Sequence, residues 1–519
     1  MRPARLAAIA AVCTAAALTL TPRPAAAFCG FYVSGADASL YNDATVVVLM
    51  RDGTRTVLAM QNNYQGPPQD FAMVVPVPVI LKESDVKTLP EAVFARVDRL
   101  AAPRLVEYWE QDPCTPEYDG PYDFAEDDVD GELLRPEGAA LSARRHGVTI
   151  EAKFAVGEYQ ILILGARDAA GLDRWLRRGG YKIPAGADAV LRPYVAAGMK
   201  FFVARVDSSK IKRGPNGQVT LSPLRFHYDS ESFHLPVRLG LLNANGKQDL
   251  IVHILADQTR YEVANYRNVA IPTNLDVTAA TRDNFAAFYT ALFDHTLAAN
   301  PGAIVTEYAW SAGTCDPCPD DPLALAELAT LGVDVLPGFA PLLAGDEAQY
   351  SIPGRFVLTR LHARYGRESL GDDLVFHAAP AIEGGREVRS QPGTIEAGAR
   401  PSGSANNFQA RYTIRHPWTG PVACEHPRRG AWGGPPANLA HHDTLQVARD
   451  LAFAPRDVAL ATFLPGAAPT TTTLPPGQPI QPGVRPPETR ACGHCGLSEG
   501  TAPLALLALG MSFRRRRRG

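Results

Sequence analysis

Short apolar runs separated by turn-forming residues dominate the first half of the chain and favour β-strands. Residues 45–50 and 54–60 are two such runs, and Asp52 and Gly53 between them form a dipeptide typical of a tight hairpin turn. Further strand-like runs begin near residue 148 and cover residues 159–164, 200–206, 224–228, 235–242 and 250–255. The pattern predicts two clusters of mainly antiparallel strands.

A third apolar run, residues 71–79, follows the first hairpin and contains Pro76 and Pro78. Because proline has no N–H group to donate to a strand ladder, we expect the end of this strand at a sheet edge or outside the sheet.

Two stretches have the hydrophobic spacing of helices instead. In residues 167–178, Leu172, Trp175 and Leu176 share one face, and the glycines that follow are expected to end the helix. Residues 282–299 carry a denser apolar face, with Thr281 as the expected N-cap.

Together these elements predict an α+β fold of mainly antiparallel sheets with flanking helices. A change of character near residue 300 divides the body into a region at 28–300 and a second, smaller α+β region at 301–464. Residues 465–491 are rich in proline and threonine and are expected to form a disordered stalk.

The N-terminus has the layout of a secretory signal peptide. Arg2 and Arg5 precede an uncharged apolar stretch at residues 6–20, and Ala25 to Ala27 supply the small residues of a cleavage site. Residues 1–27 are therefore expected to be removed by signal peptidase. The mature chain would begin at Phe28.

The C-terminus has three parts: Cys492 and Cys495, an apolar run at residues 501–513, and the basic cluster Arg514, Arg515, Arg516, Arg517 and Arg518. Thirteen helical residues reach only about 20 Å, which is short for a permanent membrane span. Residues 492–519 resemble the MYXO-CTERM type of sorting signal. The resemblance implies cleavage by a sorting protease and membrane attachment through lipid on Cys495 or, as second choice, Cys492.

The formal net charge of the whole chain is -3. Removal of both terminal segments takes away more basic than acidic residues, so the mature chain is more acidic. An acidic surface argues against nucleic acid as a partner, because phosphate binding needs a basic footprint.

Five cysteines remain in the exported body, and outside the cytoplasm such cysteines usually pair. They are Cys29, Cys114, Cys315, Cys318 and Cys424. Their pairing stays open at this point, and an odd number cannot pair completely within one chain.

The motif Cys315-Asp-Pro-Cys318 also permits a thiol-disulfide oxidoreductase, in which a helix N-terminus lowers the pKa of the first thiol. The acidic residues around the motif oppose a thiolate. A structural disulfide, within the motif or to another cysteine, is the preferred interpretation.

A zinc-dependent hydrolase is the other enzymatic alternative, because Cys424 and His426 are followed by His441 and His442. No regular ligand spacing connects these four weak candidates, so neither a metal nor another cofactor is predicted. His227, His234 and His253 lie in strand-like runs and are expected in the core or on a sheet face.

Five short motifs give the body a family resemblance. They are residues 28–30 (Phe-Cys-Gly), 71–78, 157–161, 172–176 with 180–184, and 222–226. From about residue 28 to 350 the chain resembles an exported bacterial family, domain of unknown function 2330. The resemblance implies no activity, cofactor or partner.

The sequence therefore predicts an exported protein, anchored at the cell envelope through its processed C-terminus. For each candidate catalytic motif, an ordinary structural role of the same residues is the preferred interpretation. A non-enzymatic structural or binding module is the leading hypothesis, with an unknown ligand.

Overall fold

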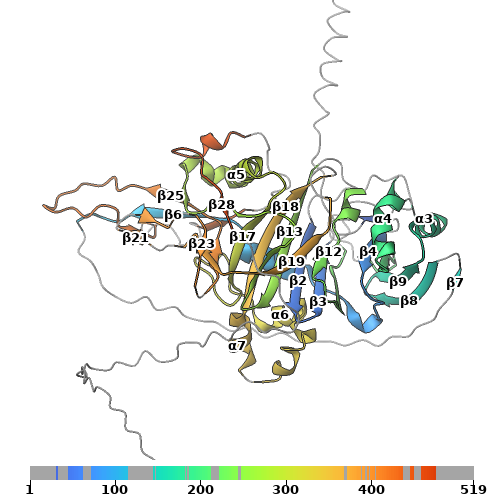
Figure 1. The fold of residues 1–519 in the computed structure, drawn as a ribbon. Coiled ribbons are helices and arrows are strands. Elements are labelled where there is room, and N and C mark those ends of the chain that lie inside the picture. Colours follow the sequence, from blue (N-terminus) through green and yellow to red (C-terminus); the bar gives the residue numbers. More distant parts are fainter. Residues whose placement is uncertain are drawn as a thin grey trace, which may run out of the picture. The chain divides into compact units, whose positions relative to one another are not determined.

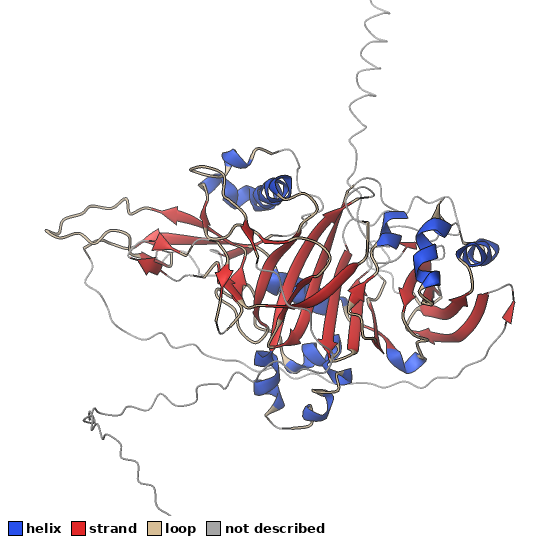
Figure 2. Cartoon of the chain, in the orientation of Figure 1, coloured by secondary structure: helices blue, strands red, loops and turns tan. Residues whose placement is uncertain are grey.

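The computed structural model describes residues 31–32, 45–61, 72–114, 144–145, 148–181, 183, 186–207, 209–211, 221–242, 247–345, 347–366, 371–386, 389–391, 394–396, 398–403, 405–435, 445–448 and 458–474. All of them lie in one compact unit, Met1–Pro482. Helices cover mixed but mainly antiparallel sheets (Figures 1 and 2). The predicted α+β class is confirmed.

The largest sheet has twelve strands and includes the predicted hairpin, β2 and β3, whose turn places Gly53 at a φ of 56°. In spatial order its main path is β23 (Arg400–Pro401), β20 (Ile382–Gly384), β24 (Asn407–Gln409), β17 (Ile304–Ser311), β18 (Phe356–Tyr365), β13 (Gln248–Asp257), β2 (Thr45–Asp52), β3 (Arg55–Gln61), β11 (Leu224–Asp229) and β5 (Val86–Thr88). Off this path, β15 (Asn268–Ala270) pairs with β17, and β28 (Thr472–Thr473) pairs with β15.

Strands from both sides of residue 300 meet in this sheet. β13 pairs with β2 on one side and with β18 on the other, and β18 pairs in turn with β17. The expected boundary near residue 300 therefore runs through a continuous hydrogen-bonded sheet. β28 also pairs with β15, so Thr472 and Thr473 from the predicted stalk belong to the packed unit.

A second sheet has six strands and contains the proline-rich run. Its order is β1 (Phe31–Tyr32), β4 (Ala72–Val77), β10 (Lys200–Val206), β9 (Tyr159–Ala166), β8 (Val148–Val156) and β7 (Arg144–Arg145). β1 reaches only Met73 and Val74 of β4, and Pro76 pairs with β10 alone. Within the described strands, the side of Pro76 away from β10 is therefore a sheet edge, as expected for a residue without an N–H group.

Three smaller sheets complete the strands. They are β12 (His234–Leu235), β19 (Leu374–Ala379) and β14 (Arg260–Val263); β16 (Leu275–Asp276), β25 (Arg411–His416) and β6 (Arg104–Glu110) with β26 (Trp432–Gly433) and β27 (Leu445–Val447); and β21 (Arg389–Gln391) with β22 (Thr394–Ile395).

The described residues form six α-helices, two of them at the predicted places. They are α2 (Glu91–Ala101), α3 (Ala169–Arg178), α4 (Ala187–Ala196), α5 (Phe285–Ala299), α6 (Leu325–Leu331) and α7 (Ala348–Arg355). α3 begins after Asp168, whose side chain accepts a hydrogen bond from the Gly171 amide. α5 corrects the prediction, because residues 279–284 form a 3-10 helix and buried Thr281 lies within it rather than at the N-cap.

Hydrophobic clusters connect these elements in layers. α3 and α4 pack on one face of the six-stranded sheet, and the other face of that sheet packs against the large sheet. The far face of the large sheet is covered by α2, α6 and α7 at one place and by α5 at another. The large sheet is thus buried on both faces.

A network of charged side chains lies on the helix-covered face of the large sheet. Glu307 of β17 is fully buried, and its carboxylate oxygens lie 2.6 Å from His362 Nδ1 and 2.6 Å from Arg360 Nε. The Tyr289 hydroxyl of α5 donates to the same carboxylate. Each charge at the centre of the network therefore has a partner of opposite sign.

The network reaches two helices. His362 Nε2 lies 3.3 Å from Asp249 Oδ1, and Arg364 Nε donates to the same oxygen at 2.6 Å. Arg364 also pairs with Asp294 of α5, and Arg360 pairs with Asp98 of α2. These contacts join both helices to the sheet through charge pairs.

The neighbours of each buried group set its protonation. Burial by itself would raise the pKa of Glu307, but His362 and Arg360 lower that pKa to about 2. Burial would lower the pKa of His362, but Glu307 and Asp249 raise it to about 9. Burial and the Arg360 charge lower the pKa of His253 to about 3, so this imidazole is neutral at pH 7.

Candidate functional site

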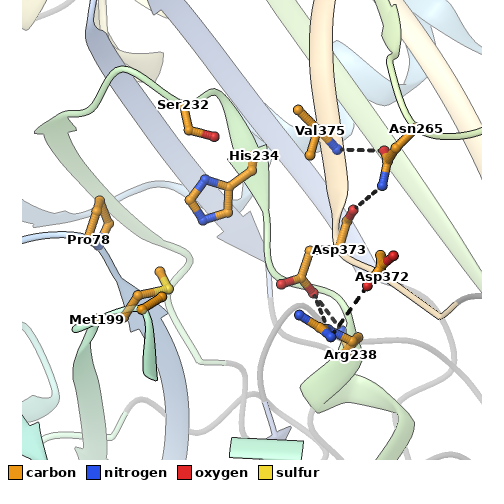
Figure 3. A pocket seen from close by; sticks show the side chains of 10 residues that line it. Pro78, Met199, Ser232, His234, Arg238, Asn265, Asp372, Asp373 and Val375 are labelled. Atoms are coloured by element: carbon orange, nitrogen blue, oxygen red, sulfur yellow. Dashed lines mark hydrogen bonds and ion pairs between the residues drawn. The ribbon is translucent and has the colours of Figure 1, made fainter. Parts of the chain in front are cut away.

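A pocket of about 540 Å³ opens where the six-stranded sheet meets the sheet of β12, β19 and β14 (Figure 3). Ten residues from separate parts of the chain line it: Pro78, Ala197, Met199, Ser232, His234, Arg238, Asn265, Asp372, Asp373 and Val375. Small-molecule sites in proteins are typically concave, with an apolar wall and a few fixed polar groups.

Asp373, just before β19, is the best-fixed polar group of the pocket. Its Oδ1 accepts hydrogen bonds from the Tyr194 hydroxyl at 2.7 Å, the Val237 amide at 2.9 Å and the Arg238 amide at 3.1 Å. Burial raises the pKa of Tyr194, and the Asp373 charge acts in the same direction. Tyr194 therefore remains a neutral donor that ties α4 to this end of β19.

The turn after β14 holds the same segment through its side chains. Asn265 Nδ2 donates to the Asp373 carbonyl at 2.8 Å, and Asn265 Oδ1 accepts from the Val375 amide at 3.1 Å. The Tyr266 hydroxyl donates to the Asp372 carbonyl at 2.8 Å. Asp372 and Asp373 therefore lie on a backbone segment that hydrogen bonds hold from two sides.

Arg238 and Asp372 are the charged groups that a ligand could reach. Arg238 lies 3.5 Å from an Asp372 oxygen and 3.6 Å from an Asp373 oxygen, and its guanidinium stacks over the Tyr194 ring at 5.4 Å. Their side chains are 25% and 78% exposed. Both distances are longer than a good hydrogen bond. The two carboxylates and the Tyr194 ring therefore hold the guanidinium in place, and its N–H groups can still donate to a ligand.

His234 faces the pocket near Met199 and Ser232 (Figure 3). Burial lowers the pKa of His234, and the Asp373 charge opposes this effect. The imidazole interacts with the main chain of Ser232 and not with its hydroxyl, which a nucleophile and base pair would require.

The opposite wall of the pocket is apolar. Pro78 and Met199 line this wall, away from Asn265 and Asp373 (Figure 3). Val375 lies on the polar side, where it is paired with His234 of β12, and it is 36% exposed although it is an aliphatic strand residue. Ile80 nearby in the sequence is also exposed. The pocket therefore offers a hydrophobic surface on one side. On the other side it offers a positively charged donor, Arg238, and negatively charged acceptors, Asp372 and Asp373.

The structure forms two disulfides from the predicted set of cysteines. Cys114, after β6, is bonded to Cys424 across a sequence separation of 310. Nearby, Glu110 accepts hydrogen bonds from the Trp418 and Gly430 amides at 2.9 Å each. The long loop after β25 is thus fastened to β6 at several points.

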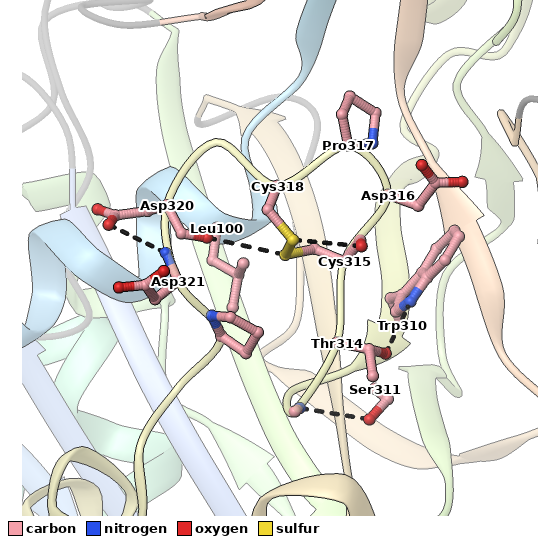
Figure 4. Close-up of a disulfide and its surroundings, with 12 residues drawn as sticks. Leu100, Trp310, Ser311, Thr314, Cys315, Asp316, Pro317, Cys318, Asp320 and Asp321 are labelled. Atoms are coloured by element: carbon pink, nitrogen blue, oxygen red, sulfur yellow. Dashed lines mark hydrogen bonds between the residues drawn. A yellow bond between two sulfur atoms is a disulfide. The ribbon is translucent and has the colours of Figure 1, made fainter. Parts of the chain in front are cut away.

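Cys315 and Cys318 are bonded to each other within their motif (Figure 4). Cys318 is exposed, and the next helix, α6, begins only at Leu325. In a thioredoxin-like site the first cysteine lies at a helix N-terminus, whose amides stabilise a thiolate. This pair lacks that arrangement and has Asp316 and Asp320 close by in the sequence.

The four zinc candidates do not come together in the described residues. The Cys424 sulfur is bonded to Cys114 and so supplies no thiolate, and His426 is exposed. His441 and His442 lie outside the described residues. The described part of the chain contains no group of three or more residues of the metal-binding types.

Several predicted residues lie outside the part that the structure describes. They are residues 1–27, Cys29, residues 475–491, Cys492, Cys495 and Arg514 to Arg518. Within the described part, none of the helices has the length and apolar character that crossing a bilayer demands.

Sequence reasoning missed most of the pocket. His234 lies on strand β12, in agreement with its expected place in the core or on a sheet face, and it also lines the pocket, whereas His253 is buried in the core and His227 is half-buried. The remaining pocket residues carry no shared motif. The nearest signal was the proline-rich run at residues 71–79, which ends beside the pocket at Pro78.

A family model described as "Uncharacterized protein conserved in bacteria (DUF2330)" matches residues 23–377. This range includes all ten residues of the pocket. No curated protein and no solved structure matches the chain.

Proposed function

The chain belongs to the DUF2330 family of uncharacterized conserved bacterial proteins, and for this member we propose an exported, envelope-anchored protein that binds a small molecule without transforming it. The ligand would occupy the pocket between Arg238, His234 and Val375. The observation that carries this proposal is the pocket's composition: fixed polar groups face an apolar wall.

The expected ligand has an apolar body and a polar group that both accepts and donates hydrogen bonds. Arg238 would donate to an acceptor oxygen, while the exposed Asp372 carboxylate would accept from an amine or hydroxyl. Val375 and Met199 would contact the apolar body. Nucleic acid is not the proposed partner, because the pocket carries two carboxylates beside one arginine.

Export and anchoring rest on the two terminal segments and on the disulfides. Two disulfides in one chain are typical of an oxidising compartment. Signal peptidase and a C-terminal sorting protease would process the chain. The membrane would then hold the mature protein through its new C-terminus.

Intact mass spectrometry of the protein from its native cells, without reduction, tests export. We expect a start at Phe28, loss of the arginine cluster, added lipid on Cys495 or Cys492, and four cysteines unreactive to thiol labels. A full-length mass would contradict both processing steps. A labelled Cys315 would favour the oxidoreductase alternative instead.

Binding is tested by denaturing the purified native protein and identifying any released small molecule. The variant Val375→Trp should fill the pocket and release none, because the added ring occupies the space beside His234. Arg192→Ala is the matched control, since Arg192 lies on the exposed surface of α4 and pairs only with Asp188 nearby. Equal yields from all three proteins would refute the proposed site.

A further inference from the structure

Among the described residues five arginines are fully buried, and they differ in how their charge is balanced. Arg225 pairs with Asp334, Arg260 with Glu262, and Arg360 with Glu307. In the described part of the chain, Arg104 and Arg411 donate to main-chain carbonyls and to a tyrosine hydroxyl rather than to a carboxylate. These two are also neighbours.

Their proximity follows from strand register. β6 and β25 run parallel, and Arg104 stands directly opposite Arg411. Side chains at paired positions project from the same face of a sheet. The alternate residues Leu105, Tyr412 and Ile414 project from the other face into the core around α5. Both guanidinium groups therefore lie on the face away from α5, and both side chains are fully buried.

The hydrogen bonds of the two guanidinium groups are incomplete. Arg104 donates to the Pro317 carbonyl at 2.7 Å and to the Leu100 carbonyl at 2.6 Å, but its Nε has no acceptor. Arg411 donates to the Tyr108 hydroxyl, while its Nε and one terminal nitrogen have none. Three buried N–H positions on two adjacent cations are thus unsatisfied.

A further unsatisfied group lies close by in the fold. Thr413 follows Arg411 by two residues on the same strand face, and its buried hydroxyl has no partner. The Tyr308 ring lies against the Arg104 guanidinium at 5.5 Å, and the Tyr308 hydroxyl interacts with the same guanidinium. The Thr413 hydroxyl can donate to an anion.

Two like charges at adjacent positions are unfavourable in a protein interior. Burial lowers the pKa of Arg104 and the Arg411 charge acts in the same direction, whereas Tyr308 and the Asp316 carboxylate oppose this effect. Arginine nevertheless remains protonated in proteins, so deprotonation does not relieve the repulsion. A buried charge is tolerated when a counter-charge with matching hydrogen bonds accompanies it.

We propose that Arg104 and Arg411 together bind a small monovalent anion between β6, β25 and the disulfide loop at residues 315–318. Its N–H donors are Arg104 Nε and the two unpaired nitrogens of Arg411, and the Thr413 hydroxyl adds a neutral donor. The site takes a halide or a carboxylate group, since both present one negative charge to converging donors.

The disulfide loop closes the site. Arg104 donates to the Pro317 carbonyl, and Gln409 Nε2 donates to the Asp316 carbonyl. Arg104 and Gln409 thereby hold two main-chain carbonyls of the Cys315-to-Cys318 loop. Because both arginines are fully buried, the occupant must be small and fully desolvated.

Thermal unfolding of the mature, oxidised protein in sodium chloride and in sodium gluconate of equal ionic strength tests the proposal. Gluconate is too large for the site, so only chloride should stabilise the folded state. We expect the midpoint to rise by about 1–2 °C for each tenfold increase in chloride above the dissociation constant. Sodium formate serves as the carboxylate arm of the same experiment.

Two variants separate this site from general effects of salt. Arg411→Met removes one cation and should abolish the difference between chloride and gluconate. Arg225→Met is the matched control, because it removes a buried arginine that has its own carboxylate, and the chloride response should persist. If Arg411→Met does not fold, crystals of the wild-type protein grown in bromide decide the question.

An anomalous bromide peak in contact with Arg104 and Arg411 supports the proposal. A midpoint that responds to formate but not to chloride also supports it and identifies a carboxylate as the occupant. Equal midpoints in chloride, formate and gluconate, together with no bromide peak at the arginine pair, would overturn it.

Discussion

The charge network around Glu307 and the pocket around Asp373 use the same residue types in opposite ways. In the network, Glu307 lies between His362 and Arg360 with no exposed surface. In the pocket, Asp373 is equally well bonded but holds a segment whose neighbours, Arg238 and Asp372, remain open to solvent. The first arrangement is closed to ligands, and the second leaves donors and acceptors available.

This difference indicates which cluster concerns stability and which concerns binding. A strongly shifted pKa often marks a functional site, but structural ion-pair networks shift pKa values as well. Here Glu307 and His362 have strongly shifted pKa values, and both side chains are buried among paired charges. The pocket has an accessible surface, and it is the better candidate for function.

The largest effect is expected from Glu307→Ala. The change leaves His362 and Arg360 buried without their shared counter-charge, so the free energy of unfolding should fall by about 3–5 kcal/mol. Urea denaturation measures this fall. Glu425→Ala, at an exposed position, should change little. A similar small loss for Glu307→Ala would mean that the network contributes little to stability.

Asp373→Ala should lower the free energy of unfolding by about 1–3 kcal/mol, because the Tyr194 hydroxyl and two amides lose their acceptor. It should also reduce ligand retention, since the acidic segment loses its support. Asp372→Ala is the control for stability, as its side chain is mostly exposed. If both variants unfold at the same urea concentration, Asp373 does not fix the pocket.

The pH dependence of stability tests the network separately. The folded-state pKa of His362 is raised to about 9 from 6.5. Its contribution is therefore complete below the unfolded value and is lost as the pH rises through about 9. Between pH 7 and 8.5 the free energy of unfolding should fall by about 1 kcal/mol per pH unit on account of this group.

His362→Gln should remove that part of the slope, and urea titrations at several pH values measure it in both proteins. His426→Gln, at an exposed site, should keep the wild-type slope. Parallel slopes in wild type and His362→Gln would show that His362 is not charged in the folded state.

The smallest effect on stability is expected from Arg238→Ala. Its ion pairs are longer than 3.4 Å and partly exposed, so the free energy of unfolding should change by less than about 1 kcal/mol. Ligand binding should nevertheless be lost. A large loss of stability would place Arg238 with the structural network rather than with the pocket.

Local patterns in the sequence predicted much of the fold. The hairpin of β2 and β3 followed from Asp52 and Gly53, and α3 followed from its apolar spacing. The start of α5 was misplaced, because a 3-10 helix before it continues the helical spacing and buries Thr281. Periodicity alone does not separate a tight helical turn from the first turn of an α-helix.

The long-range arrangement was beyond sequence reasoning. β13 pairs with β2 across about half the described chain, and Asp373 meets Tyr194 only through the packing of two sheets. Arg104 and Arg411 likewise become neighbours through strand register. Such contacts depend on tertiary pairing, which leaves no local pattern in a single sequence.

The most direct test of the proposed function is native mass spectrometry of the wild-type and Arg238→Ala proteins, each purified from the envelope of the native cells. The account predicts a stoichiometric small-molecule mass on the wild-type protein and its absence from the variant, while both proteins unfold at nearly the same urea concentration. Equal masses for both proteins, after allowing for the substitution, would contradict the assignment of the pocket as the binding site.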